Sequence, residues 1–97
     1  MDIEITDERH GALGQYHLIV DGKEVGELDY RYGDGRRVFT HTGVRPELEG
    51  NGLAAQLVRR GLDDARAEQL KVVPQCSYVA AFIARHPDDA DLLPTAE

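Results

Sequence analysis

Residues 49–54 read EGNGLA and mark the point where the pattern of the sequence changes. Beyond this point, apolar residues recur at the spacing of one helical stripe, and charged residues cover the other side. The stripe consists of Leu53, Ala54, Leu57, Val58, Leu62 and Ala65. Gly61 lies at the edge of this stripe, where glycine lowers the stability of the helix by about 1 kcal/mol relative to alanine. We therefore expect that position 61 lies close to the sheet, where a side chain would not fit. The segment therefore predicts a long helix that starts at a glycine-rich turn.

Before this turn, from Gln15 to Val44, the sequence has the period of two that is typical of strands. Three runs alternate in this way: Tyr16, Leu18 and Val20; Leu28, Tyr30 and Tyr32; and Val38, Thr40, Thr42 and Val44, which alternate with Phe39 and His41. The segments between the runs, Asp21-Gly22 and Gly33-Asp34-Gly35, are typical of tight hairpin turns. We therefore predict an antiparallel meander. Residues 3–6 add a short edge strand, and the polar residues 7–14 form its loop.

After the long helix, two further elements are predicted. Residues 71–74 read KVVP and indicate a short buried strand, because Pro74 disfavours a helical backbone at Val73. Residues 77–85 form a second helix that Pro87 ends, and we expect the acidic tail, residues 88–97, to be frayed. The long helix then connects two parallel strands. The fold class is α+β, with one mostly antiparallel sheet of about five strands.

Length and composition restrict the possible functions. The 97 residues make a single domain, 1–97, with 11 basic and 18 acidic residues and a net charge of −7. This charge argues against broad nucleic-acid binding. The sequence contains no apolar run of membrane-spanning length and no signal peptide, so we expect a cytoplasmic protein that does not bind membranes. A single cysteine, Cys76, excludes an internal disulfide framework and a CxxC metal or redox site.

The glycine-rich turn itself is a candidate phosphate site. Gly50 and Gly52 let a ligand approach the backbone, and the first turn of the helix offers unpaired N–H groups and a partial positive charge. The alternative is a loop that merely caps the helix. The segment is not a Walker loop, because no Gly-Lys-Ser/Thr follows, and it lacks the third glycine of a dinucleotide fingerprint.

Several segments together resemble the small GNAT-type N-acetyltransferases, which are minimal single-domain proteins. They are HTGV at 41–44, GNGLA at 50–54, Leu57-Val58, Ala65-Arg66 and KVVPQCSYV at 71–79. The resemblance covers roughly residues 20–87. In that family, a turn of the form Gln/Arg-x-x-Gly-x-Gly/Ala cradles the pyrophosphate of acetyl-coenzyme A. Gly52 and Ala54 match this turn, whereas Glu49 replaces the usual Gln or Arg with an acid.

The resemblance implies a GNAT-like fold, with acetyl-CoA or coenzyme A as the cofactor and a cofactor-binding set on the strand, the turn and the helices. Backbone groups of Thr42, Gly43 and Val44 would hold the pantetheine arm, and Gly50, Asn51, Gly52, Leu53 and Ala54 the pyrophosphate. Arg45 and Arg59 would supply positive charge, as would the neighbouring Arg60, although the two helix arginines could equally pair with Asp63 and Asp64. Ser77 and Tyr78 would offer hydroxyl groups.

Cys76 and His41 are the candidate catalytic residues. Cys76 is expected at the start of the second helix, where unpaired N–H groups favour thiolate, and in the resembling family this position faces the thioester. The alternative is a buried cysteine that acts as a small hydrophobe. His41 could deprotonate an ammonium acceptor, or it could simply be a half-exposed strand residue. The four histidines share no metal-ligand spacing, so we predict no metal.

These observations predict an acetyl-CoA-dependent N-acetyltransferase with an amine acceptor, either a small molecule or a protein lysine. The acidic surface hints at a cationic acceptor. Larger members of the family carry extra helices that shape the acceptor pocket, and 97 residues leave no sequence for them. The acceptor site is therefore open, completed by a partner, or absent. Two alternatives stay open: a CoA-binding module or regulatory subunit without turnover, and a protein-interaction domain whose glycine turn is only a cap.

Overall fold

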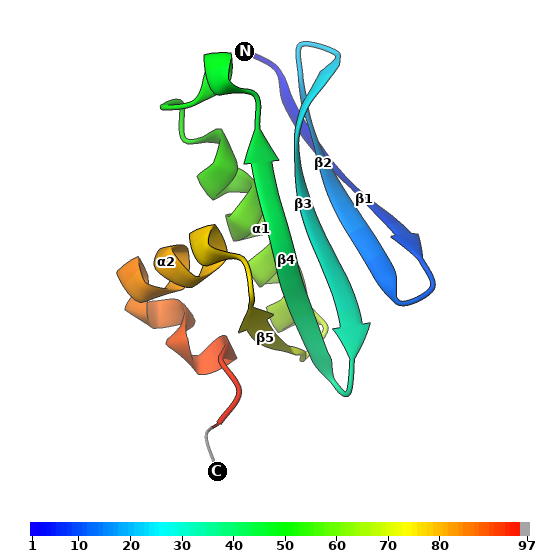
Figure 1. Ribbon diagram of the computed structural model, residues 1–97, viewed down its shortest axis with the longest axis vertical. Helices are drawn as coiled ribbons and strands as arrows, with labels where there is room; N and C mark the ends of the chain where they lie inside the picture. The colour runs from blue at the N-terminus through cyan, green and yellow to red at the C-terminus, as the bar shows by residue number, and fades with distance from the viewer. Residues whose placement is uncertain (96–97) are drawn as a thin grey trace.

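The structure is a computed structural model that describes residues 1–95. A five-stranded sheet runs in the order β1-β2-β3-β4-β5 (Figure 1). The elements are β1 (Ile3–His10), β2 (Leu13–Val20), β3 (Lys23–Gly33), β4 (Arg36–Val44), η1 (Pro46–Leu48), α1 (Leu53–Ala67), β5 (Lys71–Pro74), α2 (Ser77–Arg85) and η2 (Pro87–Leu92). The predicted α+β class and mostly antiparallel sheet are confirmed.

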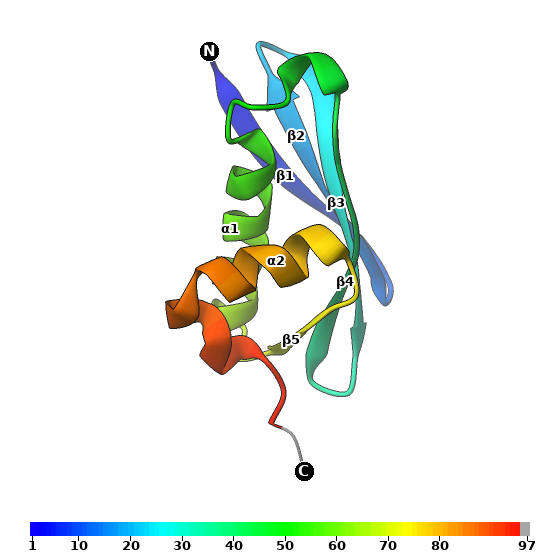
Figure 2. The ribbon, with the colours of Figure 1, turned by 60° about the vertical axis from the view of Figure 1, so that its left-hand side comes forward.

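Three antiparallel hairpins and one parallel pair build the sheet. Asp21 and Gly22 both have positive φ, as do Asp34 and Gly35, so the tight turns fall where the sequence predicts them. Helices α1 and α2 lie on the same side of the sheet (Figure 2). We call this side the helix face and the uncovered side the open face.

β1 is twice as long as the predicted edge strand. It pairs with β2 from Ile3 to His10, so the segment expected to be a loop is mostly strand, and only Gly11 and Ala12 connect the two strands. The polar residues of this half-strand are held by long-range bonds. Asp7 accepts a hydrogen bond from the hydroxyl of Tyr30, and Arg9 donates to Glu68 at 2.8 Å. Because these side chains are polar, this half of β1 lacks the alternation of apolar residues from which a strand is predicted.

β4 contains a bulge at Thr40. Asp29 of β3 pairs with His41, but the next residue, Tyr30, pairs with Phe39, so Thr40 has no partner on β3. The extra residue changes which side chains face the helices. Phe39 joins the core before the bulge, and Thr42 and Val44 face α1 and α2 after it. The simple alternation expected along this strand, with Phe39 opposite Thr42 and Val44, is therefore wrong.

The apolar stripe of α1 packs on the helix face of the sheet. Leu57, Leu62 and Ala65 are fully buried and join one core with side chains of β2, β3, β4, β5 and α2, and Ile5 of β1 packs against this core. Gly61 lies against this core, and a Cβ there would be 2.9 Å from Leu28 and from the ring of Phe39. The close approach expected at Gly61 is confirmed. No helix in residues 1–95 is both long and apolar enough to cross a membrane.

A buried guanidinium group lies at the end of this core nearest the β3–β4 turn. Arg37 is fully buried, and it donates hydrogen bonds to the hydroxyl of Tyr16 at 2.8 Å and to Glu68 at 2.7 Å. Its guanidinium also lies 4.4 Å from the ring centroid of Tyr30. Because a buried charge needs such partners, these groups fix the end of β4 that pairs with β5.

The chain continues in ordered structure beyond Pro87, although the sequence suggests a frayed tail from residue 88. Residues 87–92 form η2, in which Asp89 and Leu92 are buried. Arg59 of α1 makes two hydrogen bonds to the carboxylate of Asp89, at 2.7 and 2.8 Å. This pair holds η2, and through it α2, against α1. Residues 96 and 97 of the expected tail lie outside the described residues.

Candidate active site

A slot opens where β4 and β5 separate. Their parallel register ends at Phe39 and Pro74, and the N–H of Cys76 donates the next hydrogen bond to the carbonyl of Phe39 at 2.9 Å. Within residues 1–95, no strand pairs with the β5-facing edge of β4 from Thr40 to Val44. Backbone groups along that edge are therefore available to an extended ligand, as at the free edge of any sheet.

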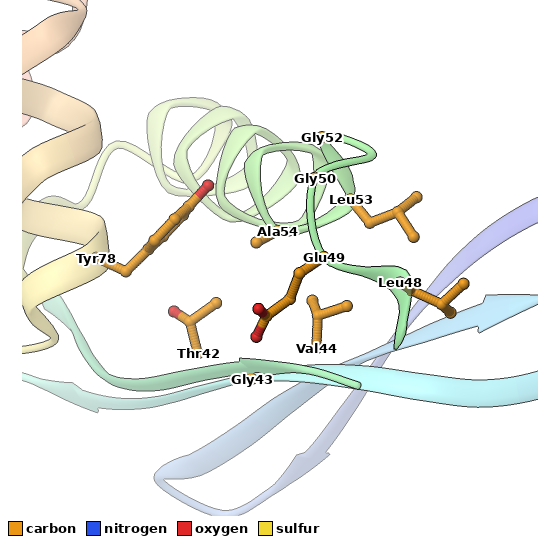
Figure 3. Close-up of a pocket in the computed structure, with 10 residues that line it drawn as sticks. All are labelled: Thr42, Gly43, Val44, Leu48, Glu49, Gly50, Gly52, Leu53, Ala54 and Tyr78. Carbon is orange, nitrogen blue, oxygen red and sulfur yellow. The ribbon is translucent and has the colours of Figure 1, made fainter. Parts of the chain in front are cut away.

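A cavity of about 420 Å³ occupies this slot (Figure 3). Its wall combines the end of β4, the turn before α1, the first turn of α1 and one residue of α2. The lining residues are Thr42, Gly43, Val44, Leu48, Glu49, Gly50, Gly52, Leu53, Ala54 and Tyr78. Eight of these are residues that the sequence predicts for cofactor binding: Thr42, Gly43, Val44, Gly50, Gly52, Leu53, Ala54 and Tyr78. Three separate segments of the chain, which are the end of β4, residues 48–54 and α2, thus meet around one volume.

The turn before α1 exposes the N-terminus of that helix to the cavity. Gly50 and Gly52 have φ of +87° and +72°, a backbone conformation that other residues adopt only with strain. Gly52 caps the helix without any side-chain bond, and its carbonyl accepts the first helical hydrogen bond from Gln56. The N–H groups of Leu53, Ala54 and Ala55 precede that bond and have no helical partner. A Cβ at either glycine would meet no atom within 4 Å, so both glycines border open space at this turn.

One feature of the cavity opposes an anionic ligand. The side chain of Glu49 extends from the turn toward β4, and Figure 3 shows its carboxylate near Gly43, between Thr42 and Val44. The carboxylate therefore lies beside the β4 edge, away from the N-terminus of α1. An extended neutral ligand on β4 would meet this negative charge, and amide N–H groups of such a ligand could donate to it.

Cys76 sits at the β5 end of the slot and is the N-cap of α2. Its Sγ lies 3.3 Å from the hydroxyl oxygen of Thr42, which faces the cavity. Burial raises the pKa of this thiol, but hydrogen bonds from the Thr42 hydroxyl and from backbone N–H groups at the start of α2 outweigh it. The net effect lowers the pKa of Cys76 below its ordinary value. A larger fraction of this thiol is therefore ionised at a given pH than of an isolated thiol.

His41 lies on the opposite side of β4 from Cys76. The bulge at Thr40 turns His41 to the open face, where its side chain is exposed, whereas Thr42 beside it faces Cys76. The structure therefore does not bring the two candidate catalytic side chains into contact. They flank the same short stretch of β4 from its two faces.

Four predicted cofactor residues lie outside the cavity. Arg59 is held by Asp89 and also contacts Asp63, which agrees with the alternative of carboxylate partners rather than phosphate. Arg45 is exposed, 3.7 Å from Glu47. Asn51 donates to the carbonyl of Leu48 at 2.8 Å and so shapes the turn. Ser77 is exposed at the first position of α2.

Leu48 is a cavity residue that the sequence reasoning missed. It ends η1, a short helix that no periodic pattern reveals, and a proline at its first position is the one local signal. No group of three or more His, Cys, Asp or Glu side chains within residues 1–95 is arranged to hold a metal ion.

A family model described as GCN5-related N-acetyl-transferase matches residues 15–92 of this chain. No curated protein sequence matches this chain. Solved structures share the fold. A GCN5-like protein from Staphylococcus aureus has a TM-score of 0.70 at 22% identity, over 95% of this chain and 90% of that one.

Two larger proteins show the same architecture. The ribosomal-protein-S18-alanine N-acetyltransferase from Escherichia coli has a TM-score of 0.69 at 12% identity, over 79% of this chain and 53% of its own length. A GNAT family acetyltransferase from Elizabethkingia anophelis, solved with acetyl-CoA bound, has a TM-score of 0.69 at 13% identity, over 86% of this chain and 72% of that one. At these identities the likeness concerns the fold.

Proposed function

Because this chain belongs to the GCN5-related N-acetyltransferase family, a family of acyltransferases, we propose that it binds acetyl-CoA in the cavity between β4 and α1 and transfers the acetyl group to an amine. The observation that carries this proposal is the shape of one cavity. It joins the open N-terminus of α1 to the unpaired edge of β4, with Cys76 near the β5 end of that edge.

Each part of the cavity suits one part of such a ligand. The N–H groups of Leu53, Ala54 and Ala55 suit a pyrophosphate, because a helix N-terminus offers donors and a partial positive charge. The edge from Thr42 to Val44 suits the amides of a pantetheine arm, which would add to the sheet as a short strand does. Bound acetyl-CoA supplies an activated acetyl thioester at the far end of that arm.

Two roles suit the Cys76 thiol at this end of the slot. As a thiolate it can attack the acetyl carbonyl and displace coenzyme A as its thiolate; a neutral amine then attacks the acetyl-cysteine, which releases the Cys76 thiolate while the amine loses a proton to solvent. Thr42 supports this role by favouring the charged form of Cys76. As a neutral thiol it can instead donate a proton to the departing sulfur. Mass spectrometry after incubation with acetyl-CoA distinguishes the two, because acetylation of Cys76 appears only in the first.

Binding of coenzyme A is the first test. At a concentration 100 times the dissociation constant, a ligand of the folded state stabilises it by about 2–3 kcal/mol, which corresponds to a rise of roughly 10–20 °C in melting temperature for a domain of this size. Gly52→Ala should abolish most of this rise, because a side chain is strained at φ +72° and would reshape the turn that presents these N–H groups.

Gly35→Ala is the matched control. Gly35 has φ of +73°, its Cβ would also meet nothing, and it lies in the β3–β4 turn away from the cavity. Both variants carry the same backbone strain, so only the response to coenzyme A should differ. A melting temperature of the wild type that coenzyme A leaves unchanged would refute the proposal.

The second candidate function is a CoA-binding module without turnover. One observation favours this second function: the two candidate catalytic side chains, His41 and Cys76, lie on opposite faces of β4 and do not contact each other, so they do not form a catalytic pair. Release of free thiol from acetyl-CoA in the presence of amines separates the two functions. The enzyme should release it faster than Cys76→Ala does, whereas equal, negligible rates would favour the module.

A further inference from the structure

The Cys76 sulfur at the end of the slot is surrounded by hydrogen-bond donors. Its Sγ lies 3.3 Å from the hydroxyl oxygen of Thr42, which lines the cavity. Burial raises the pKa of this thiol, but the Thr42 hydroxyl and the backbone N–H groups of Val79 and Tyr78 bring it below its ordinary value. Within residues 1–95, the sulfur forms no hydrogen bond with a carboxylate or an imidazole. The site therefore stabilises a thiolate without a neighbouring base.

Two proton acceptors border this part of the chain, and neither contacts the sulfur. His41 projects from the open face of β4, whereas Thr42 meets Cys76 on the helix face. Glu49 is the one carboxylate among the described residues that line the cavity. Figure 3 shows it near Gly43, on the stretch of β4 where the pantetheine arm is expected. An ammonium group that reaches Cys76 therefore has to lose its proton to solvent before it can attack a thioester.

A thiol acceptor avoids most of this requirement. In model peptides a cysteine thiol has a pKa of about 8.5 and a lysine ammonium a pKa of about 10.4. At pH 7.5, roughly 9% of the thiol is then thiolate, whereas only about 0.1% of the lysine is neutral amine. The reactive form of the thiol is therefore about seventyfold more abundant. A thiolate also attacks a thioester without any proton transfer, so a site that lacks a base suits it better than it suits an amine.

Resting on the proposed function, we infer that this site also transfers acetyl groups from one thiol to another. The Cys76 thiolate attacks the acetyl carbonyl of acetyl-CoA; a C–S bond to Cys76 forms, the C–S bond to coenzyme A breaks, and coenzyme A leaves as a thiolate. The thiolate of the acceptor then attacks the acetyl-cysteine, and Cys76 leaves as a thiolate in turn. Neither step moves a proton or needs an oxidant or a reductant. The acceptor class is an aliphatic thiol, such as the cysteine of an exposed peptide.

The test measures initial rates of acetyl transfer from acetyl-CoA by the full chain at pH 7.5, with mass spectrometry as the readout and the rate without protein subtracted. Three blocked peptides serve as acceptors: acetyl-Gly-Cys-Gly-amide, acetyl-Gly-Lys-Gly-amide and acetyl-Gly-Ser-Gly-amide. We expect the thiol peptide to react at least about fiftyfold faster than the amine peptide, in line with the abundance of the reactive forms, and the hydroxyl peptide not to react. Cys76→Ala should reduce the thiol reaction to the rate without protein.

Thr42→Val tests whether the donors around the sulfur support the reaction. A loss of about tenfold in thiolate is partly offset by the higher nucleophilicity of a more basic thiolate, so the thiol reaction should slow about threefold at pH 7.5. The deficit should disappear as pH rises and Cys76 becomes fully ionised in both proteins. Thr40→Val is the matched control, because Thr40 is an exposed residue of the same strand. It should leave the rate within about twofold of the wild type, since an exposed position tolerates such a change.

The rise in melting temperature with coenzyme A shows that each variant keeps the fold and the cavity. If coenzyme A binds but the thiol peptide reacts no faster with the wild type than with Cys76→Ala, or more slowly than the amine peptide, the inference is overturned and the proposed binding of acetyl-CoA stands. A Thr42→Val variant as fast as the wild type at every pH would overturn it as well. If coenzyme A itself fails to bind the wild type, the proposed function is refuted and this inference with it.

Discussion

Gly61→Ala sets two physical effects of opposite sign against each other. In a solvent-exposed helix this change would stabilise the protein by about 1 kcal/mol, because alanine has the higher helix propensity. Here the new Cβ would lie 2.9 Å from Cδ2 of Leu28 and from two ring atoms of Phe39. Ordinary carbon contacts are about 3.5–4.0 Å, and both neighbours are fully buried.

The overlap should outweigh the propensity. Overpacking a core by one methyl group costs about 1–3 kcal/mol, and the upper end applies here because a rigid ring and a second side chain must both move. Subtracting the gain in propensity leaves a loss of about 2 kcal/mol in the free energy of unfolding. Urea denaturation followed by circular dichroism should show a lower midpoint with an unchanged slope.

A second substitution identifies the neighbour responsible. Gly61→Ala combined with Phe39→Leu should be more stable than the sum of the two single changes predicts, because the smaller side chain makes room for the methyl group. Gln56→Ala, at an exposed position of the same helix, should shift the free energy by no more than about 0.5 kcal/mol. A Gly61→Ala variant as stable as the wild type would show that contact with the sheet does not exclude a side chain at this position.

Three further predictions concern the slot and its supports. Thr42→Val removes a hydrogen bond that lowers the pKa of Cys76, so the pH midpoint of alkylation by iodoacetamide should move upward; an unmoved midpoint contradicts the assigned cause. Glu49→Gln removes a negative charge from the cavity and should lower the dissociation constant of coenzyme A about fivefold, or roughly 1 kcal/mol, whereas Glu47→Gln outside the cavity should change it little; equal effects of the two variants would refute this reasoning. Hydrogen bonds from Arg59 lower the pKa of Asp89 in the folded state, so their contribution is fully present above the ordinary carboxyl pKa and is lost as pH falls through the folded value. Asp89→Asn should therefore lose about 2 kcal/mol at pH 7 and flatten the decline of the urea midpoint below about pH 4; a profile parallel to that of the wild type would argue against the pair.

Much of the fold could be predicted because local patterns determine it. The helix from Leu53, the strand from Lys71 and the helix from Ser77 all occur where periodicity and proline placement predict them. The membership of the acetyltransferase family, which the sequence suggests through its glycine turn and the segment around Cys76, is confirmed by the family model. Each of these signals is local, because it depends on a few neighbouring residues of the chain.

The features that could not be predicted depend on contacts between distant residues. The second half of β1, residues 7–10, is a strand because Tyr30 and Glu68 form hydrogen bonds with its polar side chains. The segment after Pro87 is ordered because Arg59 holds Asp89. The bulge at Thr40 has no sequence signal of its own, and without it the placement of His41 and Cys76 on opposite faces of β4 could not be foreseen.

The β4–β5 pairing has a consequence for how the molecule opens. The first four strands pair with their neighbours in sequence, whereas β5 joins the sheet through four residue pairs that are about 35 positions apart in the chain. Pairing of distant positions costs more chain entropy than a hairpin does, and a short edge strand opens at a lower free energy than central strands. We therefore expect amide hydrogens of β5 and the start of α2 to exchange with deuterium before those of β2 and β3. The wall that carries Cys76 would then detach and close again while the meander stays folded, which gives a long ligand a way into the slot.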